Sequence, residues 1–363
     1  MKVAIVCDWL LGIGGAERVV LELHHLFPTA PIYTSQYDPS KIDWFKDADV
    51  RTTWLQKIPK GLKKFLPVLR AWAFSHLDLS GYDVIISASG AEAKGVKTGP
   101  HTMHICYCFA PTHYYWSRYE QYMEHPGFGW LDPIARLGLK MLVGPMRRWD
   151  YKAAQRPDYM VGISTHIQKD IKRYYHRDAT LIHPPVDIER FKPVGQTKRS
   201  GFVAAGRQTP YKRIDLAVAA CTQLNLPLTV IGNGPDHARL VKMAGPTITF
   251  LTDVSDDDMP RYFQSAEGFI FPGLDDFGIV PVEAMAAGTP VIAYQGGGAL
   301  DYVVEGKTGL FFGEQTVESL VQALQNFQPA QFSTSDISKH AQSFSTEVFV
   351  QKISSFVQSK LKF

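Results

Sequence analysis

The sequence contains few cysteines and no long hydrophobic run. Four of its 363 residues are cysteines. Each lies in an apolar stretch typical of a strand or helix, so we expect buried, reduced thiols rather than a disulfide framework. Cys106 and Cys108 lack the spacing of a zinc site. No segment reaches about 18 uncharged apolar residues, so we expect no transmembrane helix. The amino terminus enters a strand directly, which predicts no signal peptide and a cytoplasmic protein.

Neither sign of charge dominates. Residues 1–190 hold 24 Lys and Arg against 19 Asp and Glu (24 − 19 = +5), and the remainder holds 14 against 16 (14 − 16 = −2). This mildly basic first half fits an acidic or phosphate-bearing partner, and we expect no nucleic-acid partner. The length exceeds that of one hydrophobic core, which predicts two domains.

Apolar runs alternate with amphipathic stretches along the whole chain, which predicts α/β domains with parallel sheets covered on both faces. Helices are expected at Ala16–Leu26 and Thr165–Tyr175, the second capped by Ser164, and at Thr346–Phe363. The expected strands are Val3–Val6, Val84–Ser87, Met103–Cys108, Tyr159–Ile163, Phe202–Ala205, Leu228–Ile231, Thr247–Leu251, Gly268–Phe271 and Val291–Ala293.

The segment from Pro184 to Ser200 is polar and contains prolines, and we interpret it as the linker between two doubly wound domains. The predicted domains are residues 1–190 and 191–345. Ligands of open parallel sheets bind beyond the carboxyl ends of the strands. Two such sheets that face each other would form a central cleft.

A glycine-rich turn, Gly12-Ile13-Gly14-Gly15-Ala16-Glu17, follows the first strand. Glu17 replaces the third glycine of the dinucleotide fingerprint, although Asp38 lies at a tolerable distance for a ribose contact. The turn is therefore a dinucleotide site, a plain surface turn, or an anion cradle in which Gly14 and Gly15 open a helix.

The second half carries a more specific pattern. In the strand, loop, helix and strand of Phe269–Tyr294, the amides around Gly278 and Ile279 have no intrahelical partner and suit a phosphate. Asp275 and Glu283 flank these amides, either to bind sugar hydroxyls or as solvated acids beside a capped helix. Upstream, a cationic pair that suits a diphosphate follows another strand. This pair is Arg207 and Lys212, which in isolation could equally be solvated.

Together these motifs resemble the retaining GT-B glycosyltransferases of family 4. The resemblance rests on the Asp275-x7-Glu283 spacing with "PVEAMAAGTPVIA", and on "GRQTPYKRID", "LIHPPVDIERF", "ISASGAEAKGV" and "GGAERVV". It covers nearly the whole chain, and the most similar branch is the bacterial mannosyltransferases that build O-antigens (lipopolysaccharide), capsules and exopolysaccharides. It implies a GT-B fold, in which two Rossmann-like domains face a central cleft and the helix of residues 346–363 packs back on the first domain.

The resemblance also implies roles for single residues. Arg207 and Lys212 would hold the departing diphosphate, and Asp275 would hold the sugar hydroxyls. His113 would take a polar role beside the reacting sugar, or be an ordinary loop histidine. These four are the catalytic candidates. The predicted donor-binding set is Gly14, Gly15, Arg207, Lys212, Val254 (near the base), Asp275, Phe277, Gly278, Ile279 and Glu283 (near the ribose).

The chain departs from the family pattern at two places. Asp275 stands where the family usually has glutamate, which puts the sugar's position or identity in doubt. Phe109 and His113 replace the usual histidine and arginine of the acceptor-side loop. Lys94 and His113 remain candidates for acceptor contacts.

The implied reaction is glycosyl transfer with retention, through front-face substitution, from a nucleotide-sugar donor. GDP-mannose is the preferred donor on resemblance, and a UDP- or dTDP-sugar is the alternative. The rival interpretations are a GT-B epimerase, a non-catalytic nucleotide-sugar-binding protein and a dehydrogenase. Asp253–Met259 resembles a metal-binding D-x-D, but these acids precede a helix whose dipole they complement. We therefore expect no cofactor and no metal.

The acceptor is expected to be a saccharide or a polyprenyl-diphosphate-linked saccharide. Residues 54–74 combine lysines with aromatic residues at helical spacing, and Pro59 and Pro67 suggest two short helices. This stretch is either an interfacial membrane contact or an amphipathic segment packed on its own sheet. The first interpretation would make the protein peripheral on the inner face of the plasma membrane.

Overall fold

The chain separates into two compact units. The computed structural model describes residues 1–59, 66–124, 126–127, 129–193 and 198–361. Unit 1 comprises Met1–His183 and Ile353–Phe363, and unit 2 comprises Pro184–Lys352. The predicted division after residue 190 therefore falls inside unit 2.

Unit 1 is built on a parallel sheet of seven strands in the order β3-β2-β1-β4-β5-β6-β7. β1 pairs along its whole length with β4, from Val3 opposite Val84 to Cys7 opposite Ala88. Both strands are buried throughout, which explains why their sequences are continuous apolar runs. The strands are β1 (Val3–Cys7), β2 (Ile32–Thr34), β3 (Val50–Thr52), β4 (Val84–Ser89), β5 (Met103–Cys108), β6 (Tyr159–Gly162) and β7 (Thr180–Leu181).

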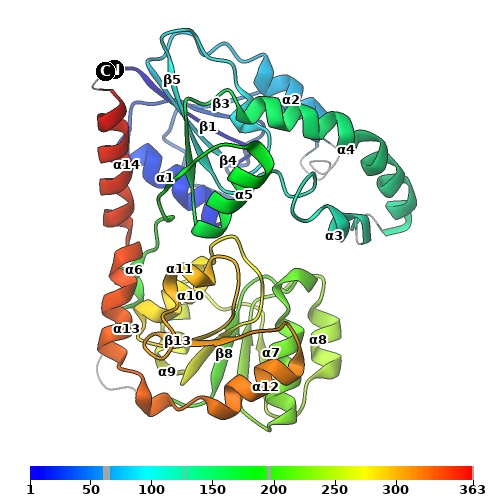
Figure 1. Ribbon diagram of the computed structural model, residues 1–363, viewed down its shortest axis with the longest axis vertical. Coiled ribbons are helices and arrows are strands. Elements are labelled where there is room, and N and C mark those ends of the chain that lie inside the picture. The colour runs from blue at the N-terminus through cyan, green and yellow to red at the C-terminus, as the bar shows by residue number, and fades with distance from the viewer. Residues whose placement is uncertain (60–65, 125, 128, 194–197, 362–363) are drawn as a thin grey trace. The chain divides into compact units, whose positions relative to one another are not determined.

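Helices cover this sheet (Figure 1). On one face, Ala4 and Val6 of β1 pack with Phe74 in a buried cluster. The last residues of the chain also belong to unit 1, where the ring of Phe356 lies 6.0 Å from that of Tyr159. The helices of the first 183 residues are α1 (Gly15–Leu26), α2 (Pro67–Ser75), α3 (Tyr119–Glu124), α4 (Asp132–Ala154) and α5 (Thr165–Tyr175), and the last helix of the chain is α14 (Thr346–Lys360).

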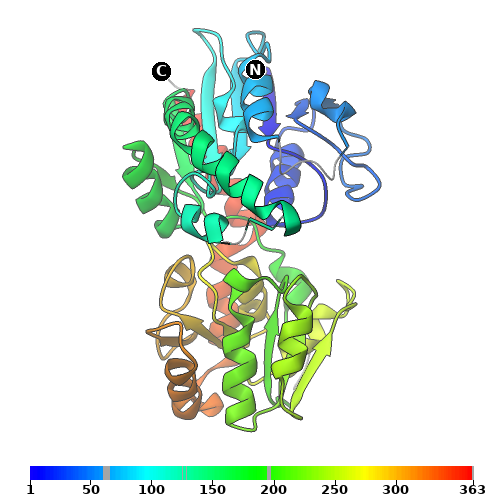
Figure 2. The ribbon, with the colours of Figure 1, turned by 90° about the vertical axis from the view of Figure 1, so that its right-hand side faces the viewer.

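Unit 2 holds a parallel sheet of six strands in the order β10-β9-β8-β11-β12-β13. α7, α8 and α12 cover one face, and α6, α9, α10 and α13 cover the other (Figures 1 and 2). The strands are β8 (Phe202–Ala205), β9 (Leu228–Ile231), β10 (Ile248–Leu251), β11 (Gly268–Phe271), β12 (Val291–Tyr294) and β13 (Gly309–Phe312). The helices are α6 (Ile188–Phe191), α7 (Ile214–Gln223), α8 (His237–Met243), α9 (Met259–Ser265), α10 (Ile279–Ala286), α11 (Ala299–Tyr302), α12 (Val317–Asn326) and α13 (Thr334–Ala341).

The strand order of unit 2 is that of a doubly wound sheet, and it reverses between β8 and β11. Ligands of such sheets bind in the crevice at this reversal, beyond the carboxyl ends of the strands. In unit 2, that position lies between the loops that follow Ala205 and Phe271. The topology alone therefore directs attention to these two loops.

The α/β class and all nine expected strands are confirmed to within two residues at their ends. The predicted cap is also confirmed, since the Ser164 Oγ accepts a hydrogen bond from the Ile167 amide at 3.1 Å. All four cysteines are free and buried. None of the helices among the described residues is long and apolar enough to cross a membrane.

The linker interpretation of residues 184–200 is wrong for its first part. This part contains α6, which packs within unit 2, and the ring of Phe191 stacks on that of Phe263 at 5.6 Å. The Gln264 side chain also donates to the backbone carbonyl of Lys192 at 2.8 Å. Residues 194–197 lie outside the described part of the chain.

Candidate functional site

The loop after β8 carries the first two predicted cations. Arg207 is exposed, and among the described residues its guanidinium has no ion-pair partner. Lys212 ends a short 3-10 helix, Pro210–Lys212, and is largely buried. This loop lies very close to the loop that contains Gly232. A Cβ at Gly232 would lie 2.4 Å from the carbonyl oxygen of Gly206. Glycine at this position allows the close approach and explains the "IGNGP" motif without a ligand.

The loop after β11 meets the loop after β8. Lys212 Nζ forms an ion pair and hydrogen bond with the carboxylate of Asp275, and their side chains are 22% and 12% exposed. A Cβ at Gly273 would lie 3.0 Å from the Lys212 backbone, so the two loops pack closely. Two catalytic candidates that are 63 residues apart in sequence are thus brought into direct contact.

The amino terminus of α10 lies at the end of the same loop. Gly278 is its N-cap with φ of 89°, a conformation that favours glycine, and it offers no capping side chain. The first turn contains no acidic residue. The amides of Ile279 and Val280 are at positions without intrahelical acceptors, and the helix dipole adds positive potential there. The arrangement suits an anion.

Two buried oxygens near this helix end lack a hydrogen-bond partner among the described residues. One is Asp275 Oδ1, and the other is the hydroxyl of Tyr302, whose side chain is completely buried. A Cβ at Gly278 would lie 2.9 Å from the Tyr302 hydroxyl. Burial, together with the charge of Asp275, raises the pKa of Tyr302 well above its usual value, so this group is a neutral hydroxyl.

Sequence reasoning missed Tyr302, and also the glycines that position Asp275. The amide of Gly298 donates to the Asp275 carbonyl at 2.9 Å. Gly297 has φ of 61°, and a Cβ there would lie 2.3 Å from that carbonyl oxygen. The run Gly296–Gly298 directly after a predicted strand was the available signal. No pattern in the sequence marks Tyr302.

Two predicted donor-binding side chains are buried. Glu283 is 6% exposed and is the fifth residue of α10, beyond its first turn. The ring of Phe277 packs against those of Tyr302 at 5.5 Å and Phe344 at 5.9 Å. The Phe277 ring therefore belongs to the core, which leaves only the backbone of this residue for a donor contact.

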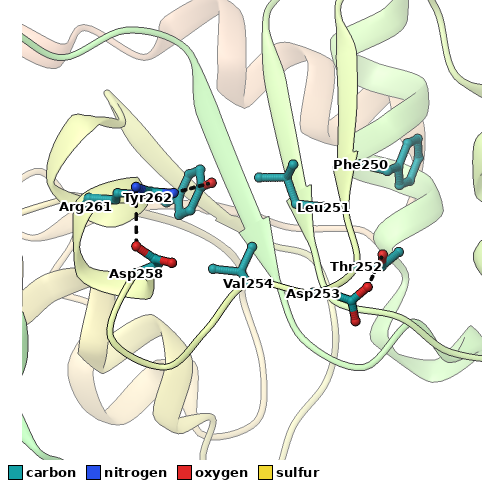
Figure 3. Close-up of a pocket in the computed structure, with 8 residues that line it drawn as sticks. All are labelled: Phe250, Leu251, Thr252, Asp253, Val254, Asp258, Arg261 and Tyr262. Carbon is teal, nitrogen blue, oxygen red and sulfur yellow. Dashed lines mark hydrogen bonds and ion pairs between the residues drawn. The ribbon is translucent and has the colours of Figure 1, made fainter.

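Val254 lines a pocket of about 270 Å³ beyond the carboxyl end of β10 (Figure 3). Arg261 stands at one side of this pocket, with its guanidinium 3.2 Å from the Tyr262 hydroxyl and 3.3 Å from Asp258. β10, β9, β8 and β11 are successive neighbours in the sheet and pair parallel. The pocket therefore lies at the same carboxyl-terminal end of the strands as the two loops above.

The corresponding edge of unit 1 is occupied by the protein's own carboxylates. Asp8 follows β1 and accepts hydrogen bonds from the amides of Gly90 (2.8 Å), Ala91 (3.0 Å) and Ala93 (2.7 Å). Gly14 is the N-cap of α1, and a Cβ there would lie 2.8 Å from Glu17 Oε2. Gly15 is the first residue of α1. Acids at both places disfavour a dinucleotide pyrophosphate, so this interpretation of the glycine-rich turn loses its physical basis.

The acceptor candidates of unit 1 are placed differently from one another. Lys94 is completely buried and forms an ion pair with buried Asp150 at 2.7 Å. Burial alone would lower the pKa of Lys94, but the Asp150 carboxylate together with Cys108 and Asp8 more than offsets burial and raises this pKa. Lys94 is therefore a buried, paired cation, and its contact with an acceptor stays a prediction. His113 is partly exposed, with Nδ1 2.9 Å from the Ser117 hydroxyl.

The acidic run before α9 has ordinary partners. The Asp258 carboxylate pairs with Arg261 and accepts from the Ser255 hydroxyl at 2.7 Å. Across the described part of the chain, no three His, Cys, Asp or Glu side chains gather into a metal-ligand group. Asp258 therefore closes the turn that leads into α9.

Comparison with known proteins finds similarity in the carboxyl-terminal unit. Residues 185–343 match the family model of the glycosyl transferases group 1. One curated relative is the GDP-mannose-dependent alpha-(1-6)-phosphatidylinositol monomannoside mannosyltransferase of Mycolicibacterium smegmatis. It is 27% identical over 228 residues, which cover 54% of this chain and 57% of that protein. The chain spans about half the length of the curated relatives it matches.

Solved structures extend the likeness over the whole chain. Sucrose-phosphate synthase of Thermosynechococcus elongatus superposes with a TM-score of 0.77 at 19% identity, covering 99% of each chain. HepE of Anabaena, in complex with UDP-glucose, gives a TM-score of 0.70 at 16% identity, covering 99% of this chain and 100% of that one. At such identities the likeness shows the fold alone, and it confirms the predicted GT-B class.

Proposed function

We propose that the protein is a retaining, metal-independent glycosyltransferase of the family 4 type. It moves a hexose from a nucleotide sugar to a saccharide or lipid-linked saccharide in surface polysaccharide synthesis. The observation that carries this proposal is the meeting of two loops at the strand reversal of unit 2. There the Lys212–Asp275 pair and the uncapped start of α10 lie beside an exposed Arg207, which has no ion-pair partner among the described residues.

In the proposed donor complex, the distal phosphate binds the amides of Gly278 and Ile279, and Arg207 binds the diphosphate. Lys212 exchanges Asp275 for the diphosphate, since a doubly charged anion competes well with one carboxylate. Asp275 then accepts hydrogen bonds from the sugar hydroxyls. This exchange explains why two catalytic candidates of opposite charge are paired in the free protein.

The chemical step requires no protein nucleophile. The bond from the anomeric carbon to the diphosphate breaks, and its electron pair stays on the leaving phosphate oxygen. The acceptor hydroxyl attacks from the same face, and its proton passes to that phosphate oxygen, so the configuration is retained. The cations and amides stabilise the developing negative charge, which accounts for most of the catalysis in such sites.

GDP-mannose is the proposed donor. The support is the name of the Mycolicibacterium relative and the likeness of the motifs to mannosyltransferases. A UDP-sugar is the second candidate, because the HepE neighbour was crystallised with UDP-glucose. A thermal-shift panel of GDP, UDP, dTDP and ADP separates the two, and stabilisation by UDP without GDP would overturn the choice of mannose.

Unit 1 is proposed to bind the acceptor, with His113 at its edge. A lipid-linked acceptor would place the enzyme at the cytoplasmic face of the plasma membrane. Trp54 and Trp72 support this placement, since they are 45% and 53% exposed with their rings 6.0 Å apart. Arg70 does not contribute, because it is buried and paired with Glu92 at 2.7 Å. Residues 60–65 of the predicted membrane stretch lie outside the described residues.

The reaction is tested by incubating the protein with radiolabelled GDP-mannose and UDP-glucose and following sugar release to water or to added polyprenyl-diphosphate saccharides. We expect slow hydrolysis of one donor, unaffected by EDTA, and its loss in Arg207→Ala. An epimerase would convert one nucleotide sugar into another without releasing the sugar. A binding protein would bind it unchanged, which would contradict the proposal.

A further inference from the structure

The amino-terminal part of α4 presents an apolar surface that is exposed among the described residues of unit 1. Ile134, Leu137 and Met141 are 67%, 60% and 69% exposed. Their spacing of three and four residues places them on one face of the helix. Figure 1 shows this part of α4 extending away from the sheet of unit 1. Single exposed apolar side chains are common, but three in a helical row indicate an interaction surface.

This outward face is not the face by which α4 packs on its own unit. The buried residues of α4 begin only at Met146 and continue with Asp150. Met146 lies in a cluster with Ala71 of α2. At about 100° per residue, the exposed row is turned roughly 120–220° around the axis from Met146 and Asp150. α4 is thus apolar on its core side and again on the opposite side.

The exposed charges of α4 are almost all positive. Arg136, Lys140, Arg148 and Lys152 are exposed, whereas the Arg147 guanidinium is bound to the Tyr115 carbonyl. Of its two acids, Asp150 is buried against Lys94, which leaves Asp132 alone to oppose them. A partner for this face must therefore combine an apolar interior with a negatively charged surface.

The projecting part of α4 is a poor helix on its own. A Cβ at Gly138 or Gly144 would meet nothing within 4 Å, so neither glycine serves close packing. Pro145 lies inside the helix and removes one backbone hydrogen bond. The two glycines and the proline each lower the stability of the helix relative to alanine. A segment with these residues, and with no fully buried side chain before Met146, gains stability when a surface covers it.

From these observations we infer that the outward face of α4 docks on the surface of an anionic lipid bilayer. A row of large apolar residues beside cations is the pattern of an interfacial helix. The exposed Trp72 of α2, next to α4 in unit 1, supplies an amphipathic ring suited to the headgroup region. A second copy of the chain is disfavoured, because it would bring Arg136 and Lys140 of both copies together. The inference deepens the proposed membrane acceptor, but vesicle binding does not depend on glycosyl transfer.

Flotation of the full chain with vesicles tests this inference directly. At 50 mM salt we expect co-flotation with vesicles containing phosphatidylglycerol, and little with pure phosphatidylcholine. Leu137→Glu with Met141→Glu should weaken binding about 100-fold or more, and Arg136→Gln with Lys140→Gln about 30-fold. Val241→Glu, at an exposed apolar site of α8, is the matched control and should bind like the wild type. Circular dichroism verifies that each variant is folded.

Hydrogen exchange gives a second readout, in which residues 133–145 should become protected with anionic vesicles. Failure of the protein to float at 50 mM salt overturns the inference. So does flotation that the α4 variants leave unchanged. Self-association that the Leu137→Glu and Met141→Glu pair abolishes, without vesicle binding, would assign the face to a second copy instead. Absence of nucleoside diphosphate binding would overturn the donor site and leave these results standing.

Discussion

Replacing Lys212 by methionine should separate the structural role of the Lys212–Asp275 pair from its role in donor binding. In the free protein the change leaves the Asp275 carboxylate, which is 12% exposed, without its cation. Its Oδ1 already lacks a partner among the described residues. The variant should therefore be less stable and should also bind nucleoside diphosphate more weakly, for two different reasons.

The magnitude follows from the exposure of the pair. Exposed ion pairs contribute about 0–1 kcal/mol, and breaking a buried pair costs about 3–5 kcal/mol. At 22% and 12% exposure we expect an intermediate loss of about 2 kcal/mol in the free energy of unfolding of unit 2. For a unit of this size that corresponds to about 4–8 °C in Tm. Loss of one charge-assisted contact should raise the Kd for the diphosphate about 10- to 100-fold.

Three variants make the assay decisive. Lys212→Met with Asp275→Asn removes both charges, so it should recover most of the stability but none of the affinity. Arg239→Met breaks a more exposed pair with Asp236 in the same unit. It should change neither the stability nor the affinity for diphosphate by a comparable amount. Circular dichroism follows both units, whereas tryptophan emission reports only unit 1, because all seven tryptophans lie there. A Lys212→Met protein that is destabilised yet binds diphosphate normally, by titration calorimetry, would refute the donor role.

Further predictions concern single side chains. Arg207→Ala should leave the unfolding free energy within about 0.5 kcal/mol and lower turnover about 100-fold; unchanged turnover would remove Arg207 from the site. Tyr302→Phe deletes a buried hydroxyl with no partner among the described residues, so urea unfolding should show equal or greater stability, by up to about 1 kcal/mol; a comparable loss would reveal a partner for that hydroxyl. Burial lowers the pKa of His104 to about 3, below its unfolded value of 6.5. As pH falls from 6.5 toward 3, His104 becomes protonated in the unfolded chain but stays neutral in the native protein. The free energy of unfolding should therefore fall by at most about 1.4 kcal/mol per pH unit. In His104→Gln the slope of unfolding free energy against pH should be shallower, and an unchanged slope would contradict the assignment.

The sequence predicts the central strands well and the edges poorly. β1 and β4 are buried on both faces, so their apolar runs are unambiguous. β3 and β7 are short edge strands with exposed residues, so their sequences contain no continuous apolar run. The sequence does not reveal α6, because Ile188–Phe191 is a single turn whose two apolar residues matter only through tertiary packing.

The candidate site shows the same division. Gly278 and Asp275 were identifiable because helix capping and charge leave a local pattern. The burial of Lys94 could not be predicted, because nothing in the sequence indicates its pairing with Asp150, 56 residues away. Tyr302 was missed because its significance comes from the space beside Gly278, and only the folded backbone defines that space.

The most direct test of the central claim is hydrogen exchange of the full chain with and without GDP and UDP. The account predicts that one of them protects residues 206–213 and 273–283 of unit 2. Protection confined to the turn of residues 10–18 in unit 1, or no protection by any nucleoside diphosphate, would contradict it.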